Sequence, residues 1–267
     1  MGRMRVLGLA LLGLLLATSG ASAYTLDGDL SDWGVTLSLN GSGLFNNAWA
    51  PGAGSTGTVQ YSALDNAYRN ANQGGESYDV EALYVDADAT NVYFAAVLST
   101  DPAGQPWESW IMRQGDLALR PYSAANWTTS GTGVPAYGVG VRQRPSGDRF
   151  QEVWQGSTWK YDDGFTGPAY MRAGTGTQTG SATVTVTQWS GGGDRGSAGT
   201  WIVEGSIPRS ALGNPTGVWQ FRISPSCNND WEVVNYDLTS VPEPATLLLF
   251  TAGLGGLFAA RRRRHNK

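Results

Sequence analysis

Histidine and cysteine are nearly absent from this chain of 267 residues, which has one of each, His265 and Cys227. The stretch from Tyr24 to Ser240, called the body here, therefore has no histidine. This excludes Ser-His-Asp catalysis, Cys-His catalysis and histidine-bound zinc from the body. A single cysteine permits no disulfide within the chain. We expect Cys227 to be a small buried apolar residue, with a reactive thiol as the alternative.

Positive charge is also scarce in the body. The body holds 11 of the chain's 18 Lys and Arg residues but 21 of its 22 Asp and Glu residues, so its formal charge is 11 − 21 = −10. A charge of this sign repels nucleic-acid phosphates and anionic lipid head groups. We therefore expect the body to bind no nucleic acid and no anionic membrane surface, whereas sugars or cations suit it as ligands.

Residues 1–23 have the pattern of a secretory signal peptide. Arg3 and Arg5 precede an apolar run from Val6 to Ala17, and Ala21-Ser22-Ala23 forms a cleavage site of small residues. A buried core helix is the alternative, but the position and the cationic flank favour export. We expect the exported chain to begin at Tyr24.

Residues 241–267 form a tail of three parts. Its first part is Val241, Pro242, Glu243 and Pro244, where the prolines hold the backbone extended and outside any strand or helix. The uncharged run from Ala245 to Ala260 predicts a transmembrane helix about 24 Å long, short against a hydrocarbon core of about 30 Å. The cluster of Arg261, Arg262, Arg263 and Arg264 then stays cytoplasmic and leaves the body outside. A core helix of a soluble domain is the alternative.

This combination of an acidic proline motif, an apolar helix and an arginine cluster resembles the PEP-CTERM sorting signal of Gram-negative envelope proteins. The resemblance implies processing by an exosortase, a membrane-embedded transpeptidase that cuts near Pro-Glu-Pro and passes the protein to the cell surface or the exopolysaccharide matrix. Glu243 would be a recognition residue in that scheme.

Short runs of alternating apolar and polar residues recur through the body, bounded by Gly, Asn, Asp and Pro, as in antiparallel strands. The clearest runs, Tyr78 to Val85 and Asn91 to Leu98, are separated by turn formers and predict a β-hairpin. In the first run, Tyr78, Val80, Ala82 and Tyr84 are expected to share one face. Further strands are predicted at 115–120, 137–142, 150–154, 182–188, 201–207, 218–224 and 232–238. We predict an all-β domain over residues 24–240, an antiparallel two-sheet sandwich of jelly-roll or immunoglobulin-like type.

Three stretches of the body are similar to family 9-like carbohydrate-binding modules and DOMON-like sandwiches. They are "DGDLSDW" at Asp27 to Trp33, "VEALYVDADATNVYFAAVLSTD" at Val80 to Asp101, and "WIVEGSIPRSALG" at Trp201 to Gly213. The resemblance implies a β-sandwich that binds sugars. Arg209 stands where that family often has a tryptophan, which argues against sugar stacking at this point.

Two acidic turns are candidate cation sites. Asp27, Asp29 and Asp32 bring three carboxylates together, and calcium accepts such oxygen ligands, although the spacing is not that of an EF-hand. The alternative, which we favour, is a solvated turn whose side chains cap backbone N–H groups. Asp86, Asp88 and Asn91 have the same ambiguity, and a hairpin turn is favoured there too.

Tryptophan is abundant, with 11 residues in the chain, all of them in the body. A Trp face stacks on the apolar face of a sugar ring. The candidates for stacking are those outside the alternating pattern: Trp49, Trp107, Trp110, Trp127, Trp154 and Trp159. Core packing is the competing interpretation for each of them.

Three classes of function follow from these patterns. The first is an exported, non-catalytic β-sandwich that associates with envelope or matrix polysaccharide. The second is a structural surface protein with no discrete ligand. The third is a glycan-cleaving enzyme, which needs two carboxylates. The glutamates Glu81, Glu108, Glu152, Glu204 and Glu232 are available for it, but we expect strand glutamates to face solvent.

Overall fold

The computed structural model describes residues 24–40, 45, 49–52, 59–63, 76–107, 110–124, 127, 134–141, 149–160, 168–193, 199–228 and 230–239. Residues Tyr24–Ser240 form one compact unit. The predicted signal peptide and the predicted transmembrane helix lie outside the described residues. Among the residues that are described, no helix is long and apolar enough to cross a membrane.

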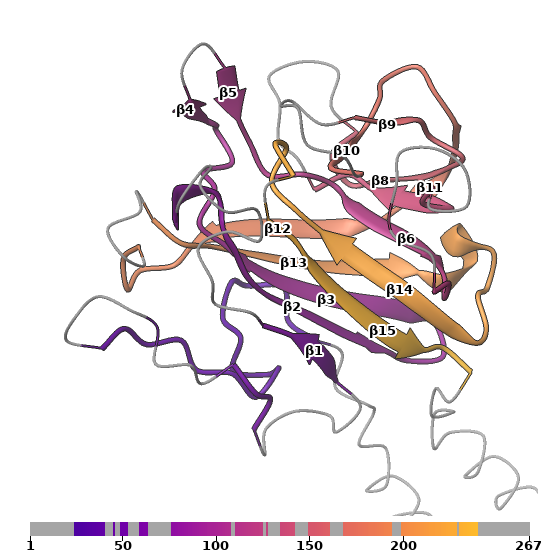
Figure 1. Ribbon diagram of the computed structural model, residues 1–267. Coiled ribbons are helices and arrows are strands. Elements are labelled where there is room, and N and C mark those ends of the chain that lie inside the picture. Colours follow the sequence, from indigo (N-terminus) through magenta and orange to yellow (C-terminus); the bar gives the residue numbers. More distant parts are fainter. Residues whose placement is uncertain are drawn as a thin grey trace, which may run out of the picture. The chain divides into compact units, whose positions relative to one another are not determined.

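The body is all-β, as predicted, with two large antiparallel sheets packed as a sandwich (Figure 1). The five-stranded sheet has the order β1-β2-β3-β13-β12 and the six-stranded sheet the order β11-β8-β7-β6-β14-β15. The strands are β1 (Gln60–Ser62), β2 (Val80–Ala87), β3 (Asn91–Leu98), β6 (Leu117–Pro121), β7 (Tyr137–Val139), β8 (Glu152–Gln155), β11 (Thr177–Ser181), β12 (Thr183–Gln188), β13 (Trp201–Pro208), β14 (Val218–Ile223) and β15 (Glu232–Asp237). The predicted hairpin is therefore confirmed as β2 and β3.

Two small hairpins and two turns of 3-10 helix complete the described structure. One hairpin pairs β4 (Gln105–Trp107) with β5 (Trp110–Met112), and the other pairs β9 (Trp159–Lys160) with β10 (Tyr170–Met171). The 3-10 turns are η1 (Glu76–Tyr78) and η4 (Arg209–Leu212). The sequence does not predict these hairpins as such, because strands of two or three residues are too short to show a period.

A β-bulge corrects the predicted alternation in β2. Val80 pairs with Leu98, but the next partner pair is Ala82 with Val97, so Glu81 is an extra residue on its strand. Because directly opposed residues lie on the same face of a sheet, Val80 and Ala82 lie on opposite faces. The expectation that they share a face is therefore wrong.

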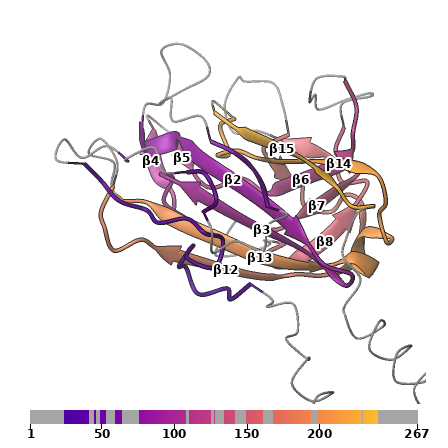
Figure 2. The same ribbon diagram turned by 90° about the horizontal axis from the view of Figure 1, so that it is seen from below.

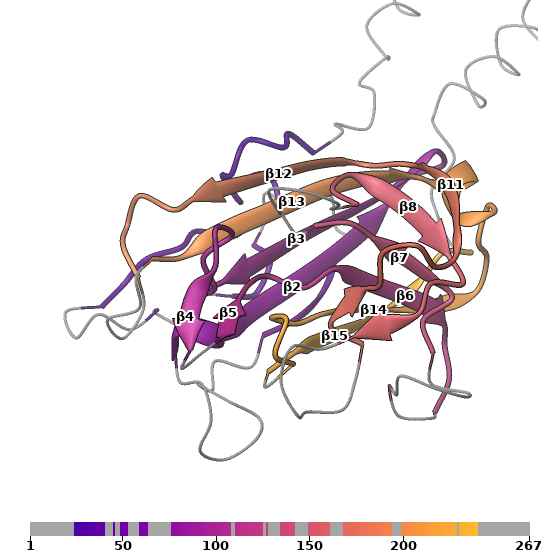
Figure 3. The same ribbon diagram turned by 90° about the horizontal axis from the view of Figure 1, so that it is seen from above.

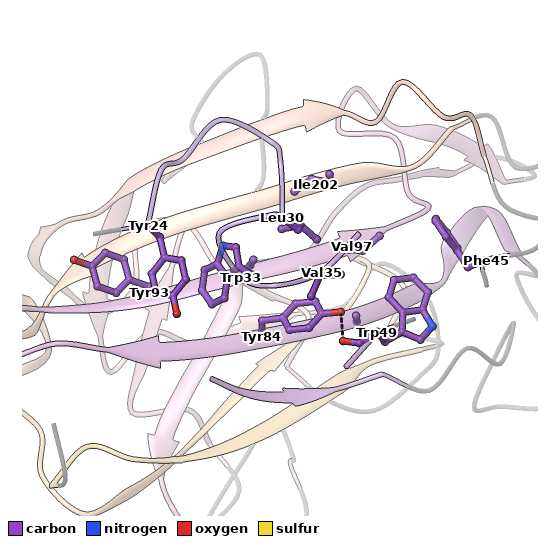
Figure 4. Close-up of a cluster of buried hydrophobic side chains, with 12 residues drawn as sticks. Tyr24, Leu30, Trp33, Val35, Phe45, Trp49, Tyr84, Tyr93, Val97 and Ile202 are labelled. Carbon is purple, nitrogen blue, oxygen red and sulfur yellow. Dashed lines mark hydrogen bonds between the residues drawn. The ribbon is translucent and has the colours of Figure 1, made fainter. Parts of the chain in front are cut away.

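The five-stranded sheet is covered on both faces, which explains why every residue of β2 is buried. One face packs against the six-stranded sheet. The other face is covered by the N-terminal segment of the body, called the N-terminal cover here (described residues 24–40, 45 and 49–52; Figure 2). Figure 4 shows its aromatic side chains lying on Tyr84 and Tyr93, with the Tyr84 hydroxyl donating to the Trp49 carbonyl oxygen at 2.8 Å.

Arg209 connects the end of the body to two turns that precede it. This residue follows β13, and its guanidinium group donates to the carbonyl oxygens of Pro215 at 2.7 Å, Leu238 at 3.0 Å and Asp88 at 3.3 Å. Arg209 is thus a structural latch on the last turn of the described chain.

Candidate functional site

The outer face of the six-stranded sheet has two small residues between two large ones. Trp154 on β8, Gly138 on β7, Ala118 on β6 and Arg222 on β14 are direct partners across four neighbouring strands. They therefore form one row on one face of the sheet. The two central residues are small, so this face can accept another element on top of it.

The β9–β10 hairpin packs on these two small residues. Trp159 and Met171, partners in the hairpin, form a buried cluster with Ala118, and Trp127 and Trp154 pack against that cluster. A Cβ atom at Gly138 would lie 2.4 Å from the Met171 sulfur and 2.7 Å from the Trp159 ring, so the hairpin leaves room only for glycine. The structure thus brings together three of the tryptophans predicted to stack: Trp127, Trp154 and Trp159. We call these three residues the tryptophan cluster.

A buried aspartate holds the hairpin to the sheet. Asp116 precedes β6, and its two carboxylate oxygens accept hydrogen bonds from the backbone N–H of Met171 at 2.8 Å and of Val141 at 3.2 Å. The neighbouring Gly115 has no space for a side chain, because a Cβ would lie 2.2 Å from the Ser224 carbonyl oxygen. The sequence Gly115-Asp116 therefore has a positioning role that its pattern alone does not indicate.

Two arginines stack on the rings of the cluster. The guanidinium carbon of Arg120 lies 4.1 Å from the ring centroid of Trp127, and that of Arg149 lies 3.7 Å from Trp154. Each contact stabilises by about 0.5 to 2 kcal/mol, depending on desolvation. Burial lowers the pKa of both guanidinium groups. An arginine nevertheless stays charged in proteins, so both remain cations.

The stacked arginines are fixed by further hydrogen bonds. Arg120 Nε donates to Gln220 Oε1 at 2.9 Å, while Arg149 donates to the Ser157 hydroxyl at 2.8 Å and to the Thr175 carbonyl at 2.7 Å. Trp154 Nε1 donates to Glu152 Oε2 at 2.8 Å. Neither arginine was singled out from the sequence, because a stack between residues far apart in the chain leaves no local pattern.

The three rings differ in exposure. Trp159 is buried, whereas Trp127 and Trp154 are partly exposed. Trp159 is therefore packed between the hairpin and the sheet, whereas the rings of Trp127 and Trp154 reach the surface. The indole N–H groups of Trp127 and Trp159 have no hydrogen-bond acceptor within the described part of the chain.

The remaining candidate tryptophans lie elsewhere. Trp107 and Trp110 are direct partners in the β4–β5 hairpin, which lies apart from β9 and β10 in Figure 1, and their side chains lie outside the described residues. Trp49 is buried in the N-terminal cover, as the core-packing interpretation expects.

The first acidic turn is held by hydrogen bonds within the protein. The Asp27 carboxylate accepts from the Asp29 N–H at 2.9 Å, Asp29 from Ser31 at 2.9 Å, and Asp32 from Thr25 at 2.7 Å. These are the bonds of the capped-turn alternative. Across the described ranges, no three Asp, Glu, His or Cys side chains are grouped so as to hold a metal ion. Calcium binding at this turn stays a prediction.

The same turn is anchored by a buried glutamate. Glu204 on β13 accepts hydrogen bonds from the Gly28 N–H at 2.6 Å and from the Trp33 indole at 3.0 Å. Burial raises the pKa of Glu204 to about 7, and the nearby Asp32 and Asp27 add to the shift. Burial likewise raises the pKa of Asp32. The "DGDLSDW" motif is therefore a structural element that fastens the N-terminal cover to the sheet.

The second acidic turn closes the β2–β3 hairpin. Asp88 accepts hydrogen bonds from the Thr90 and Asn91 N–H groups at 2.7 Å and from the Tyr93 hydroxyl at 2.8 Å. Burial alone would raise the pKa of Asp88, but these bonds outweigh it and lower the pKa. Asp86 is buried and accepts from the Tyr236 hydroxyl at 2.7 Å. Both carboxylates thus serve the fold.

The glutamates considered for catalysis differ from the expected strand residues in their solvent exposure. Glu81, Glu204 and Glu232 are fully buried, so the expectation that strand glutamates face solvent is wrong for them. Glu81 accepts from the Ser99 hydroxyl at 2.6 Å, and Glu232 accepts from the Ser62 hydroxyl. Glu152 is partly exposed beside Trp154, and Glu108 lies outside the described residues.

The tail matches a known family model. Residues 240–264 match the family model described as the PEP-CTERM protein-sorting motif. This chain carries a PEP-CTERM sorting motif. The match covers the predicted motif residues Val241 to Pro244 and the arginine cluster, and it implies an exported, envelope-associated protein that is processed by an exosortase.

Comparisons of the chain with curated proteins and with solved structures found no match. The likeness of the body to family 9-like carbohydrate-binding modules and DOMON-like sandwiches therefore has no support from them.

Proposed function

We propose that this protein is a non-catalytic surface or matrix protein whose body binds polysaccharide through the tryptophan cluster. The observation that carries the proposal is the gathering of Trp127 and Trp154, from separate parts of the chain, beside Trp159 on one sheet face. Two partly exposed rings, each backed by a guanidinium group, offer flat apolar surfaces to sugar rings.

The charge of this face indicates the kind of sugar. Arg120, Arg149 and Arg222 lie on or beside it, and the hairpin adds the exposed side chains of Lys160 and Arg172. Among the described residues, these five cations outnumber the two carboxylates beside them, Asp116 and Glu152, although the body as a whole carries −10. An acidic polysaccharide therefore fits better than a neutral one.

The route to the surface rests on the two ends of the chain. In this proposal the signal peptide exports the chain, the apolar helix from Ala245 to Ala260 holds it in the membrane, and Arg261 to Arg264 keep the end of the tail in the cytoplasm. The exosortase then acts at Pro242-Glu243-Pro244. The body faces the polysaccharide layer at each stage.

Retention of the purified full chain on immobilised polysaccharides tests the binding site. We expect retention on acidic glycans that falls as salt is raised, because exposed charges are screened. The double variant Trp127→Ala/Trp154→Ala should lose retention. Trp189→Ala is the matched control, since this partly buried tryptophan packs against the cluster of the N-terminal cover.

Two outcomes would count against glycan binding at this face. One is equal retention of the double variant and the wild-type chain. The other is no retention on any glycan by a folded chain, which would favour the structural role without a discrete ligand. Carboxylate-based cleavage of the glycan is tested in the same experiment by release of shortened chains, and we expect none.

A further inference from the structure

The two lateral sides of the sandwich differ in how their edge strands are protected. On one side, β1 has three residues, and β15 carries Glu232 and Asp237 and lies beside β2 and β1. Short length, charge and cover are the usual devices that keep a sheet edge from pairing with another chain. That side is therefore protected from pairing with a strand of another chain.

The opposite side is formed by one continuous segment, Thr177 to Gln188. Its first half is β11, at the edge of the six-stranded sheet, and its second half is β12, at the edge of the five-stranded sheet (Figure 3). The segment contains no charged residue and no proline. β11 has an irregularity between Gln178 and Gly180, which protects an edge, whereas the register of β12 is regular throughout.

The backbone of β12 presents unpaired groups to the outside. Trp189 N–H donates to the Thr200 carbonyl, so the odd-numbered residues before it bond to β13. The backbone N–H and C=O groups of the even-numbered residues point away from β13. Accordingly, the Val184 carbonyl accepts from the Gln151 side chain and not from β13. This leaves the N–H and C=O of Val186 and the N–H of Val184 without a partner strand among the described residues.

The sequence of the strand makes it complementary to itself. Thr183-Val184-Thr185-Val186-Thr187 reads the same in both directions. Two copies placed antiparallel about Thr185 therefore match Thr with Thr and Val with Val. In that register Val184 of one copy lies opposite Val186 of the other, and the backbone groups of both point away from β13. The Val184 N–H can donate to the Val186 carbonyl of the other copy, whereas the Val184 carbonyl, which already accepts from the Gln151 side chain, takes the Val186 N–H as a second donor. With no charge on the strand, like charges do not oppose each other across the contact.

We infer that β12 is a self-association edge, where a second copy of this chain adds its own β12 antiparallel and joins two five-stranded sheets into one. Strand addition of this kind is a general mode of recognition. A contact of one short strand buries less than the roughly 1,000 Å² of a stable interface, so it is weak and depends on a high local concentration. The inference is independent of the glycan site, which lies on the other sheet.

Cysteine cross-linking of the full chain tests this contact directly. Thr185 pairs with its own copy in the inferred register, at a position whose backbone groups bond to β13. Cα atoms of such pairs are about 4.5 Å apart, within the range that a disulfide bridges. The native Cys227 is buried and does not compete. We expect Thr185→Cys to form a disulfide-linked dimer on oxidation.

Two further variants make the result specific. Val186→Pro removes an N–H that points away from β13, so the fold keeps its ladder but the contact loses a hydrogen bond; added to Thr185→Cys, it should abolish the dimer. Val218→Cys, 42% exposed on β14, controls for random collision and should stay monomeric.

A Thr185→Cys chain that stays monomeric on oxidation would overturn the inference. So would equal dimerisation of Val218→Cys, or dimerisation that survives Val186→Pro in folded protein. Circular dichroism of each variant verifies the fold.

Discussion

Both sheets have an outer face covered by an added element, but the covers are held in different ways. The N-terminal cover packs buried aromatic rings on the five-stranded sheet, and one of them, Trp33, is hydrogen-bonded to the buried Glu204. The β9–β10 hairpin leaves two tryptophans partly exposed on the six-stranded sheet and backs them with arginines. The first arrangement maximises burial, as a core does. The second keeps flat surfaces available, as a binding site requires.

The largest effect on stability is expected when the packing of the N-terminal cover is disrupted. Trp33 is fully buried, stacks on Tyr24 with ring centroids 3.9 Å apart, and donates to Glu204. Trp33→Ala should lower the free energy of unfolding by about 3 to 5 kcal/mol, because it removes a large buried side chain. Urea denaturation of the purified chain measures this. A loss below that of Trp154→Ala would contradict the contrast between the two covers.

A smaller effect on stability is expected at Asp116, which holds the β9–β10 hairpin to the sheet. Asp116→Asn replaces one acceptor oxygen by an NH₂ group that cannot accept from the backbone N–H of Met171 or Val141. Hydrogen bonds to a charged group contribute about 1.5 to 3 kcal/mol each, so a local loss of about 2 to 3 kcal/mol follows. Hydrogen exchange should show reduced protection in β9 and β10 with β2 and β3 unchanged. Uniform loss over both sheets would show that the hairpin is not a separate unit.

The N-terminal cover should also respond to pH. The pKa of Glu204 is raised from 4.5 to about 7, so the folded chain binds this proton more tightly than the unfolded chain does. Stability from this group is present at low pH and is lost as the pH rises from about 4.5 through about 7, by up to about 3 kcal/mol. Urea midpoints between pH 5 and 8 measure the trend, and Glu204→Gln should flatten it. A Glu204→Gln chain whose stability has the same pH dependence as the wild type would show that Glu204 is not the source of that dependence.

The smallest effect on stability is expected at the exposed part of the tryptophan cluster. Trp154→Ala removes a partly exposed ring and its stack with Arg149, worth about 1 kcal/mol. Its unfolding should differ little from that of the wild type, while retention on acidic polysaccharide falls. Thermal melting and column retention on the same samples separate the two effects. A large drop in melting temperature would assign Trp154 to the core.

The main strands could be predicted from the sequence because they are long enough to alternate. β3, β12 and β13 lie within a residue or two of the expected ranges. The bulge at Glu81 could not be predicted, since a single extra residue is visible only against the partner strand. Trp127, Trp154 and Trp159 are among the candidates for ligand stacking in the sequence, but their cluster could not be predicted, because its members meet only when the hairpin docks on Gly138.

The acidic turns show why chemistry read from local sequence can mislead. Asp27, Asp29 and Asp32 look like cation ligands when only their neighbours are considered. Their role is decided by Glu204, which lies 171 residues beyond Trp33. Likewise, buried carboxylates such as Glu81 can be recognised only when both faces of a strand are seen to be covered.

The latch formed by Arg209 limits the length of the tether between the folded body and the sorting motif. Leu238 is fixed by its carbonyl bond to this arginine, and Pro242 lies four positions further on. At about 3.5 Å per residue, this stretch spans at most about 14 Å. In the proposed processing at Pro-Glu-Pro, the exosortase would act within this distance of Leu238. The proposed product would then keep a connection of only a few residues beyond the Arg209 contact.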